Sequence, residues 1–256
     1  RVGYPVVLKP VGGNHGRGAT INVTNWEDAV IALAAAKRIS RGVIVEKFIT
    51  GYDYRLLVVD YKFIAGAKRT PAMVTGDGKH SIKELVDVVN KDPRRGYGHE
   101  KVLTSIKIDD TTLAILQEKN LTLDSVLKKG EELHLKRTAN LSTGGTSTDV
   151  TEIVHPYNVF MAERIARIIG LDICGIDIMS PDISIPMHEN GGAVLEVNAG
   201  PGFRMHIAPA DGLPRNVAEP VIDMLYPPGA TARIPIIAVT GTNGKTTSTF
   251  ILKNIL

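Results

Sequence analysis

Two short stretches decide the fold: residues 175–179 read GIDIM, and residues 193–198 read AVLEVN. Both are apolar runs of strand length, and the connection between them contains proline and glycine, so we predict two strands joined as a hairpin. Side chains alternate along a strand, which places Glu196 and Asn198 on one face. A neighbouring strand that carries Asp177 would bring three oxygen donors together.

These three donors suit a magnesium ion. Mg²⁺ is a hard cation that takes carboxylate and amide oxygens together with the phosphate oxygens of a substrate. Carboxylates in otherwise apolar strands are costly to bury unless they are paired or bind a metal. A structural ion pair is the alternative, and we predict a metal site at Asp177, Glu196 and Asn198.

Near the start of the chain, a predicted strand at residues 6–8 leads through Lys9 and Pro10 into a glycine-rich loop, residues 12–18. An ammonium group at a strand end can reach a bound phosphate where glycine backbone allows a close approach. A surface lysine beside a turn is the alternative. Protein kinases place such a loop before their lysine, so the order here disfavours that class.

The next part of the chain suggests where a nucleotide base would lie. Asn25 predicts the start of a helix that runs through Lys37, and a strand follows at residues 43–49. Residues 46–49, which include Glu46, Lys47 and Ile49, can offer edge N–H and C=O groups to an adenine, with Glu46 accepting a hydrogen bond from its exocyclic amine. Asp53 follows at a spacing suited to ribose hydroxyls. Ordinary strand-end residues are the alternative.

Downstream, strands are predicted at residues 54–59 and 62–67, joined by a tight turn. Residues 76–136 then become charged and helical, with the basic pair Arg94 and Arg95, which indicates an inserted lid subdomain. A polar loop at residues 140–147 follows. Helices are predicted over residues 156–169 and near residues 216–225.

A second nucleotide motif lies beyond a proline- and glycine-containing linker, residues 226–233. A buried strand is predicted at residues 234–239, followed by the loop Gly241, Thr242, Asn243, Gly244, Lys245, Thr246 and Thr247 and then a helix. Backbone N–H groups at a helix start can cradle phosphates, while Lys245 neutralises them and Thr246 reaches Mg²⁺. A glycine-rich turn without a ligand is the alternative.

Composition limits the remaining possibilities. The 256 residues carry a formal charge of +3 with acidic and basic residues interspersed, which gives nucleic-acid binding little support. A single cysteine, Cys174, excludes an internal disulfide framework. No apolar run approaches the roughly 20 residues that span a bilayer, so we expect a cytoplasmic protein away from membranes. Both ends interrupt an element, and we expect a fragment of a longer protein.

At this point VVLKP with GGNHGRG, VEKFITGYDYR, GIDIM and LEVNAGPGF together resemble the ATP-grasp superfamily, in its usual order, over residues 1–225. The resemblance implies an α/β ATP-grasp fold that is incomplete at its N-terminus. It also implies that Lys9 contacts ATP phosphates beneath a loop containing Gly13, Gly16 and Gly18. Asp53 departs from the more usual Glu at the ribose position. The GTNGKTT motif is similar to that of the Mur ligases, so residues 234–256 would open a Mur ligase-like domain.

An ATP-grasp region followed by a Mur-like loop, with RTANLSTGGTSTDVT and NAGPGFRMH, resembles the cyanophycin synthetase family. That resemblance implies an ATP-dependent ligase that builds a poly-aspartate backbone bearing arginine. Its first site would add aspartate to a primer, and its second site would add arginine. Arg55, His15, Ser142 and Arg204 are candidates for contacts with the acyl phosphate or with substrate carboxylates. The complete protein is expected to be a homo-oligomer. Another ATP-grasp peptide ligase of the glutathione synthetase type, or a non-catalytic ATP-binding module, are the alternatives.

Overall fold

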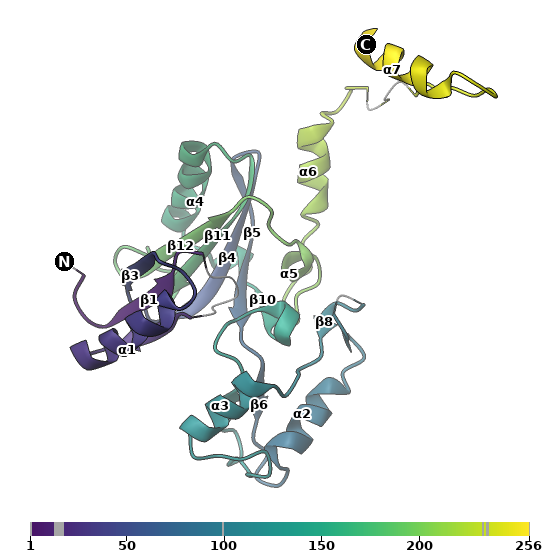
Figure 1. Cartoon of the computed structure of the whole chain (residues 1–256). Helices are drawn as coiled ribbons and strands as arrows, with labels where there is room; N and C mark the ends of the chain where they lie inside the picture. The colour runs from purple at the N-terminus through teal and green to yellow at the C-terminus, as the bar shows by residue number, and fades with distance from the viewer. Residues whose placement is uncertain (1, 13–17, 99, 232, 234–235, 256) are drawn as a thin grey trace. The chain divides into compact units, whose positions relative to one another are not determined.

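The computed structural model describes residues 2–12, 18–98, 100–231, 233 and 236–255 (Figure 1). The chain divides into two compact units, Arg1–Val221 and Ile222–Leu256. Among the described residues, the first unit holds all the sheets, and the second contains the end of one helix and a last helix.

The first unit begins with a small antiparallel sheet in the order β2-β1-β3. Its strands are β1 (Val6–Pro10), β2 (Thr20–Val23) and β3 (Val43–Lys47). Helix α1 (Trp26–Lys37) packs on this sheet, and Asn25 caps it as predicted by accepting a hydrogen bond from the Asp28 N–H at 2.8 Å. Alternate side chains of β1, Val6 and Leu8, are buried against the helix, so the apolar alternation fixes which face is covered.

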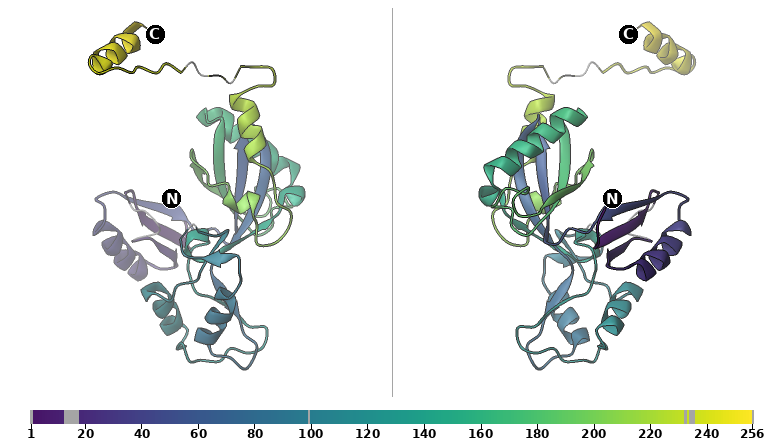
Figure 2. Two further views of the ribbon diagram at one scale, coloured as in Figure 1. Left: turned by 90° about the vertical axis from the view of Figure 1, so that its right-hand side faces the viewer. Right: turned by 90° about the vertical axis from the view of Figure 1, so that its left-hand side faces the viewer.

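A five-stranded antiparallel sheet in the order β10-β5-β4-β11-β12 forms the centre of the unit. Its strands are β4 (Tyr52–Val59), β5 (Lys62–Thr70), β10 (Thr146–Asp149), β11 (Ile173–Ser180) and β12 (Ala193–Asn198). The predicted hairpin is therefore present as β11 and β12. Helix α4 (Pro156–Ile169), with the predicted bounds, lies across one face of this sheet (Figure 2).

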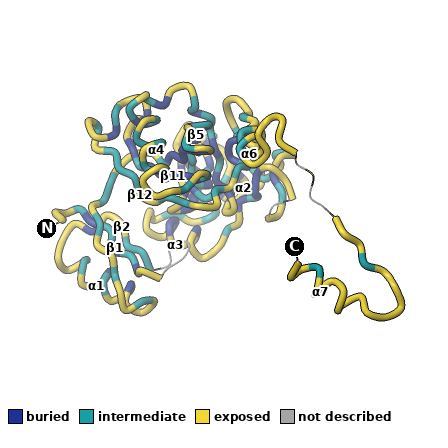
Figure 3. The backbone as a smooth tube through the Cα atoms, turned by 90° about the horizontal axis from the view of Figure 1, so that it is seen from above, coloured by how far each residue is buried: buried dark blue, intermediate teal, exposed yellow. Residues whose placement is uncertain are grey.

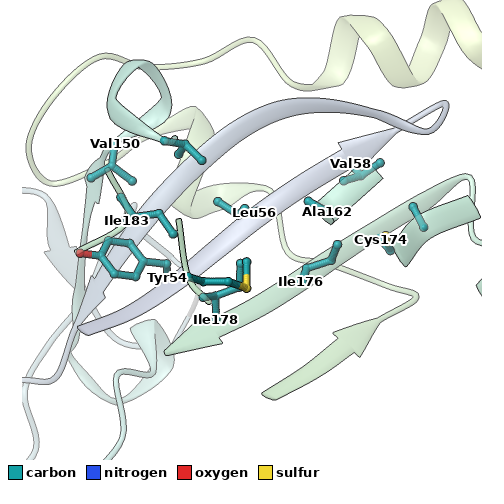
Figure 4. Packing of buried hydrophobic residues seen from close by; sticks show 12 residues of the cluster. Tyr54, Leu56, Val58, Val150, Ala162, Cys174, Ile176, Ile178 and Ile183 are labelled. Carbon is teal, nitrogen blue, oxygen red and sulfur yellow. The ribbon is translucent and has the colours of Figure 1, made fainter. Parts of the chain in front are cut away.

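One hydrophobic core of this unit joins side chains of the central sheet to Ala162 of α4 (Figure 4). Leu56, Ile176 and Ile178 from the two middle strands are buried with Ala162 of the helix. The middle strands are near-continuous apolar runs interrupted by Arg55 and Asp177, which face away from this core. Register places Asp177 opposite Arg55 on one side and opposite Glu196 on the other. A polar cluster is thus built into the otherwise apolar sheet.

Residues between β5 and β10 form a subdomain with its own hydrophobic core, which includes Val74, Ile82 and Leu135. Its elements are β6 (Met73–Thr75), α2 (Ile82–Asn90), β7 (Arg95–Gly96), β8 (Leu103–Thr104), α3 (Asp110–Glu118) and β9 (Glu132–His134). Ser81 and Glu84 form a capping box that fixes the start of α2. Within residues 76–136, which were predicted as charged and helical, the described part contains two helices and three short strands.

The first unit also contains two 3₁₀ turns and a short helix. A 3₁₀ turn at Leu141–Thr143 precedes β10, and helix α5 (Arg204–Ile207) packs on β5 and β10. A second 3₁₀ turn lies at Thr151–Ile153. Helix α6 (Ala218–Leu225) spans the boundary between the two units.

A strand was predicted at residues 234–239, and this prediction is wrong for residues 236–239, which the structure describes. Residues 236–239 adopt no strand, and the tube through this segment is coloured mostly as exposed (Figure 3). The Ile236 and Ile237 side chains are 91% and 55% exposed, and residues 234 and 235 lie outside the described ranges. A buried strand needs neighbours that pair with its backbone and cover both faces. None of the described strands pairs with this segment. The helix predicted after the loop is present as α7 (Lys245–Ile255).

None of the helices in the described part of the chain has an apolar stretch long enough to cross a bilayer.

Candidate active site

An open cleft of about 980 Å³ lies where the first sheet, the central sheet and two loops of the first unit meet. Seven residues predicted from the sequence line it together, although they come from positions between 9 and 204. They are Lys9, Asp53, Arg55, Ser142, Asp177, Glu196 and Arg204. The fold therefore gathers the predicted phosphate-binding, metal-binding and substrate-binding candidates into one site.

Lys9 lies at the edge of the cleft, on β1, and forms an ion pair with Glu46 on the adjacent strand β3 at 2.7 Å. Both side chains are more than one-third exposed. An exposed pair of this kind contributes little to stability and can be exchanged for another partner. The Lys9 ammonium therefore stands at a strand end where it can turn to a phosphate, with Glu46 beside it.

The glycine loop after Lys9 is only partly described. Gly13, His15 and Gly16 lie outside the described residues, so their predicted roles stay predictions. Gly18 at the end of the loop has a φ of +72°, and a Cβ added to it would lie 2.5 Å from the Ile39 side chain. Both the backbone conformation and the close contact favour glycine at this position.

The predicted adenine contacts lie beside the cleft rather than among the residues that line it. Lys47 ends β3 and is exposed, and Ile49 follows it half-buried. The Phe48 N–H donates to the Pro5 carbonyl at 2.9 Å, which holds this segment along the first sheet. The adenine assignments of Glu46, Lys47 and Ile49 stay predictions.

Four charged side chains form a network on the floor of the cleft. The Arg55 guanidinium binds both carboxylate oxygens of Asp177, with 2.9 Å between Nη2 and Oδ2. Arg69 bridges two carboxylates: its Nη2 lies 3.1 Å from Asp177 Oδ2, and its Nε lies 2.8 Å from Asp53 Oδ1. Arg69 was not singled out from the sequence. The sequence shows Arg69 only as a basic residue on a predicted strand. Its ion-pair partners depend on the register of the sheet, which the sequence does not show.

The pKa values of the two carboxyl groups in this network shift in opposite directions. Burial raises the pKa of the Asp53 carboxyl, in spite of its pairing with Arg69. Burial also disfavours the charge on Asp177, but the hydrogen bond from Arg55 and the charges of both arginines hold the pKa of its carboxyl below the ordinary value. Asp177 forms ion pairs with two arginines. Asp53 forms an ion pair with one arginine and lies near the negative charge of Asp177.

The predicted metal ligands lie on β11 and β12. Asp177 and Glu196 are cross-strand partners, and the Asn198 amide donates to Glu196 Oε1 at 3.1 Å. Only oxygen donors are present, which fits a hard cation. Asp177, however, already carries two arginines. Over the described ranges, no three His, Cys, Asp or Glu side chains gather into a metal-binding group. The three-ligand magnesium site stays a prediction, with Glu196 as its exposed carboxylate.

Two loops carry the predicted substrate contacts. Ser142 is exposed, and both its N–H and its hydroxyl donate to Asn140 Oδ1, at 2.9 and 2.8 Å. Arg204 is half-buried at the start of α5, with its Nη1 3.4 Å from the Lys101 carbonyl. Asn140, which the sequence placed only within a polar loop, fixes the orientation of Ser142.

One buried histidine was missed entirely. His206 is 2% exposed, and neither ring nitrogen has a hydrogen-bond partner among the described residues. Burial, together with the positive charge of Arg55, lowers the pKa of His206 to about 4. The sequence offered no signal for it, because a histidine on a four-residue helix has no periodicity to show which way it faces.

In the second unit, the predicted phosphate loop, Gly241 to Gly244, runs directly into α7, which begins at Lys245. The Lys245 ammonium donates to the Gly241 carbonyl at 2.6 Å, and Gly241 and Gly244 both have positive φ. Thr242 and Asn243 complete the loop, and Thr246 and Thr247 lie in the first turn of the helix. This loop-to-helix geometry suits an anion, and the nucleotide role of these residues stays a prediction.

Comparisons with known proteins agree with the sequence motifs. No family model matches the sequence. The cyanophycin synthetase of Crocosphaera subtropica is 56% identical over 255 residues, which is 99% of this chain and 29% of that protein. The glutathione biosynthesis bifunctional protein GshAB of Listeria monocytogenes is 37% identical over 86% of this chain and 29% of that protein.

A crystal structure of a bifunctional glutathione synthetase from Pasteurella multocida superposes with a TM-score of 0.65 and 37% identity, covering 87% of this chain and 30% of that one. The predicted resemblance to the cyanophycin synthetase family is confirmed, as is the mixed α/β fold, which this chain shares with that glutathione synthetase. The chain spans less than a third of the length of the curated relatives that it matches. The Mur ligase-like part of the fold stays a prediction.

Proposed function

We propose that this chain, which is similar over nearly its whole length to cyanophycin synthetases, is the part of such an enzyme that adds aspartate to a growing primer. The reaction is an ATP-dependent ligation. A carboxylate oxygen of the primer attacks the terminal phosphorus of ATP and releases ADP. The amine of aspartate then attacks the activated carbonyl carbon, phosphate leaves, and the amine loses a proton.

Positioning and charge neutralisation would supply most of the rate enhancement in such a reaction. Lys9 stands at the edge of the cleft, where its ammonium can exchange Glu46 for a phosphate oxygen. Arg55 and Arg69 provide fixed positive charge on the floor. The cleft therefore offers cationic groups to both the nucleotide and the carboxylate that becomes phosphorylated.

The acceptor end of the primer would lie toward the two loops. Ser142 offers a hydroxyl, and Arg204 offers a guanidinium suited to a carboxylate. The two residues belong to different segments of the chain, and both line the cleft. His15, in the glycine loop, is a further candidate for contact with the phosphorylated carboxyl. Asp53 is proposed for the ribose, although its present partner is Arg69.

Oxygen atoms of Glu196 and Asn198, with Asp177, would hold Mg²⁺. When bound, the ion would neutralise charge on the phosphate groups. The two arginines on Asp177 suggest that Glu196 provides most of the available negative charge. Substitution of Glu196 is therefore the most direct test of this assignment.

The motif from Gly241 to Thr247 is proposed to hold a second ATP, with Thr246 toward its Mg²⁺, in a Mur ligase-like site that adds arginine. One observation carries the whole proposal: the cyanophycin synthetase match covers 255 of 256 residues and so includes both nucleotide motifs. The GshAB match covers 223 residues and leaves the rest of the chain outside.

The test uses the complete protein that contains this chain, with ATP, Mg²⁺, a short aspartate–arginine primer, aspartate and arginine. Mass spectrometry should show one aspartate added when arginine is omitted, and alternating increments when both are present. ADP should form only with primer and aspartate. Ligation of γ-glutamylcysteine to glycine instead would favour a glutathione synthetase-like enzyme. Binding of ATP without ADP formation from any acceptor would indicate a non-catalytic module.

A further inference from the structure

Arg95 is a buried cation that the proposed chemistry does not use. It lies on β7 in the inserted subdomain and is 9% exposed. Among the residues that the structure describes, no carboxylate lies within ion-pairing distance of its guanidinium. Its Nη1 donates instead to two backbone carbonyls, Thr104 at 2.6 Å and Gly144 at 3.1 Å. A buried arginine is costly unless its donors are satisfied, so these two contacts determine where it lies.

The second of these carbonyls belongs to the loop that carries Ser142. Gly144 ends the 3₁₀ turn Leu141–Thr143 with a φ of +97°, and Leu141 is buried beneath it. A Cβ added at Gly144 would lie 2.8 Å from Ile106 Cγ1, so this turn packs directly on the segment that follows β8. The Gly145 N–H donates to the Asn140 carbonyl at 3.1 Å and closes the loop.

These contacts leave Ser142 only two residues from an anchored carbonyl. Its hydroxyl is held by Asn140 on one side, and the end of its turn is held by Arg95 on the other. The same subdomain segment also reaches the second loop with a substrate candidate, because the Lys101 carbonyl accepts from Arg204. Arg95 and Lys101 therefore contact the two cleft-lining loops that would face the primer.

We propose that Arg95 is a positioning residue for the acceptor site: it holds the Ser142 loop in the conformation that binds the carboxylate end of the primer. This inference rests on the proposed function. Arg95 donates its side-chain hydrogen bonds to Thr104 and to Gly144 of the Ser142 loop, whereas the nucleotide candidates Lys9 and Glu46 belong to β1 and β3. Its loss should therefore weaken primer binding and leave ATP binding unchanged.

The experiment measures aspartate addition by the complete protein with primer and ATP varied separately. Arg95→Met removes every donor but keeps an apolar side chain of similar length. It should raise the KM for primer about tenfold, with the KM for ATP within about twofold of the wild type. Arg95→Lys keeps the charge but loses the planar guanidinium, so a smaller, several-fold rise is expected. The neighbouring Arg94→Ala removes the same charge from an exposed site and should leave both KM values within about twofold.

A double variant identifies the route of the effect. If Arg95 acts through Ser142, then Ser142→Ala combined with Arg95→Met should raise the primer KM no further than the worse single variant. Circular dichroism checks that each variant is folded. Should Arg95→Met fail to fold, Arg95→Lys decides, and an unchanged primer KM in that variant overturns the proposal.

Other results separate this inference from the proposed function. A folded Arg95→Met enzyme with normal primer KM, alongside Ser142→Ala with a raised one, overturns the role of Arg95 and leaves the function standing. Equal increases in both KM values also overturn it, because they indicate a general disturbance of the cleft. A wild-type protein that adds no aspartate to the primer overturns the proposed function itself.

Discussion

Two segments of the chain have the same sequence pattern and different structures. Val6–Pro10 and residues 236–239 are both apolar runs that precede a glycine-rich loop with a nearby lysine. The first is the middle strand of a sheet, with Leu8 3% exposed, whereas Ile236 is 91% exposed and unpaired in the described structure. Apolar composition indicates that a segment can be buried. Whether it is buried depends on the strands and helices available to cover it.

The loops that follow differ in the same way. Lys9 is paired with a carboxylate on an adjacent strand, and the surrounding sheet places it in a cleft with five other charged candidates. Among the described residues, the Lys245 ammonium donates hydrogen bonds only to the carbonyls of its own loop, at Gly241 and Thr242. A local motif can therefore form its loop and helix start without neighbours, but a complete site needs the tertiary structure around it.

The largest expected effect separates the two lysines in the complete protein. Lys245→Ala removes the cation from the second loop, so a primer should still gain aspartate while arginine addition falls about a thousandfold. Lys9→Ala should lower aspartate addition by a similar factor. Mass spectrometry of short primers shows each increment, and the exposed Lys253→Ala and Lys37→Ala are matched controls. Loss of the aspartate increment in Lys245→Ala, with arginine transfer spared, would reverse the assignment of the two sites.

Two substitutions that shorten a side chain, made in the 256-residue chain, test whether the two apolar runs differ in burial. Leu8→Ala leaves a cavity in a covered strand and should lower the free energy of unfolding by about 3 kcal/mol. Ile236→Ala removes an exposed side chain and should change it by less than about 0.5 kcal/mol. Urea unfolding followed by circular dichroism measures both. Equal costs at the two positions would mean that residues 236–239 are covered in solution.

Much of the fold was predictable because its signals are local. The bounds of α4 and β12, the Asn25 cap and the β11–β12 hairpin all follow from periodicity, capping chemistry and turn composition. These patterns depend on residues a few positions apart. The predicted strand at residues 234–239 failed because pairing partners are not a local property.

The candidate site was predictable in its residues but not in their contacts. Asp177 and Arg55 were each selected for ligand chemistry, yet they bind each other because the register of β4 and β11 places them opposite one another. Arg69 joins them from β5 for the same reason. Arg95 drew notice only as a basic residue, since its carbonyl partner lies 49 positions away. Cross-strand and long-range partners need the three-dimensional structure.

A third prediction sharpens the difference between the two nucleotide sites. Glu196→Gln keeps the shape of the side chain and removes its charge, so aspartate addition by the complete protein should fall about a hundredfold. Arginine addition to a primer that ends in a bare aspartate should be unchanged. ADP release with each amino acid supplied separately is the measurement, and the exposed Glu189→Gln is the control. A near-normal rate of aspartate addition would leave Glu196 with a structural role only.

The smallest expected effect concerns pH and distinguishes the two units through their histidines. All seven histidines precede residue 207, so none lies in the second unit. His206 is buried, and its pKa is lowered to about 4 from the ordinary value of 6.5. Between these values the unfolded chain binds a proton that the folded chain does not, so stability should fall as the pH drops below about 6.5.

From the two pKa values, this loss amounts to about 2 kcal/mol between pH 7 and pH 5. His206→Phe keeps an aromatic ring in the buried site and cannot be protonated, so its stability should depend less on pH over this range by about that amount. Urea unfolding of the 256-residue chain at both pH values measures the difference, and the exposed His188→Phe controls for the loss of any histidine. Because helix α7 contains no histidine, its hydrogen exchange, corrected for the intrinsic effect of pH, should not follow the change at His206. If His206→Phe retains the full pH dependence, the buried imidazole is not its source, and other titrating groups of the first unit cause the acid sensitivity.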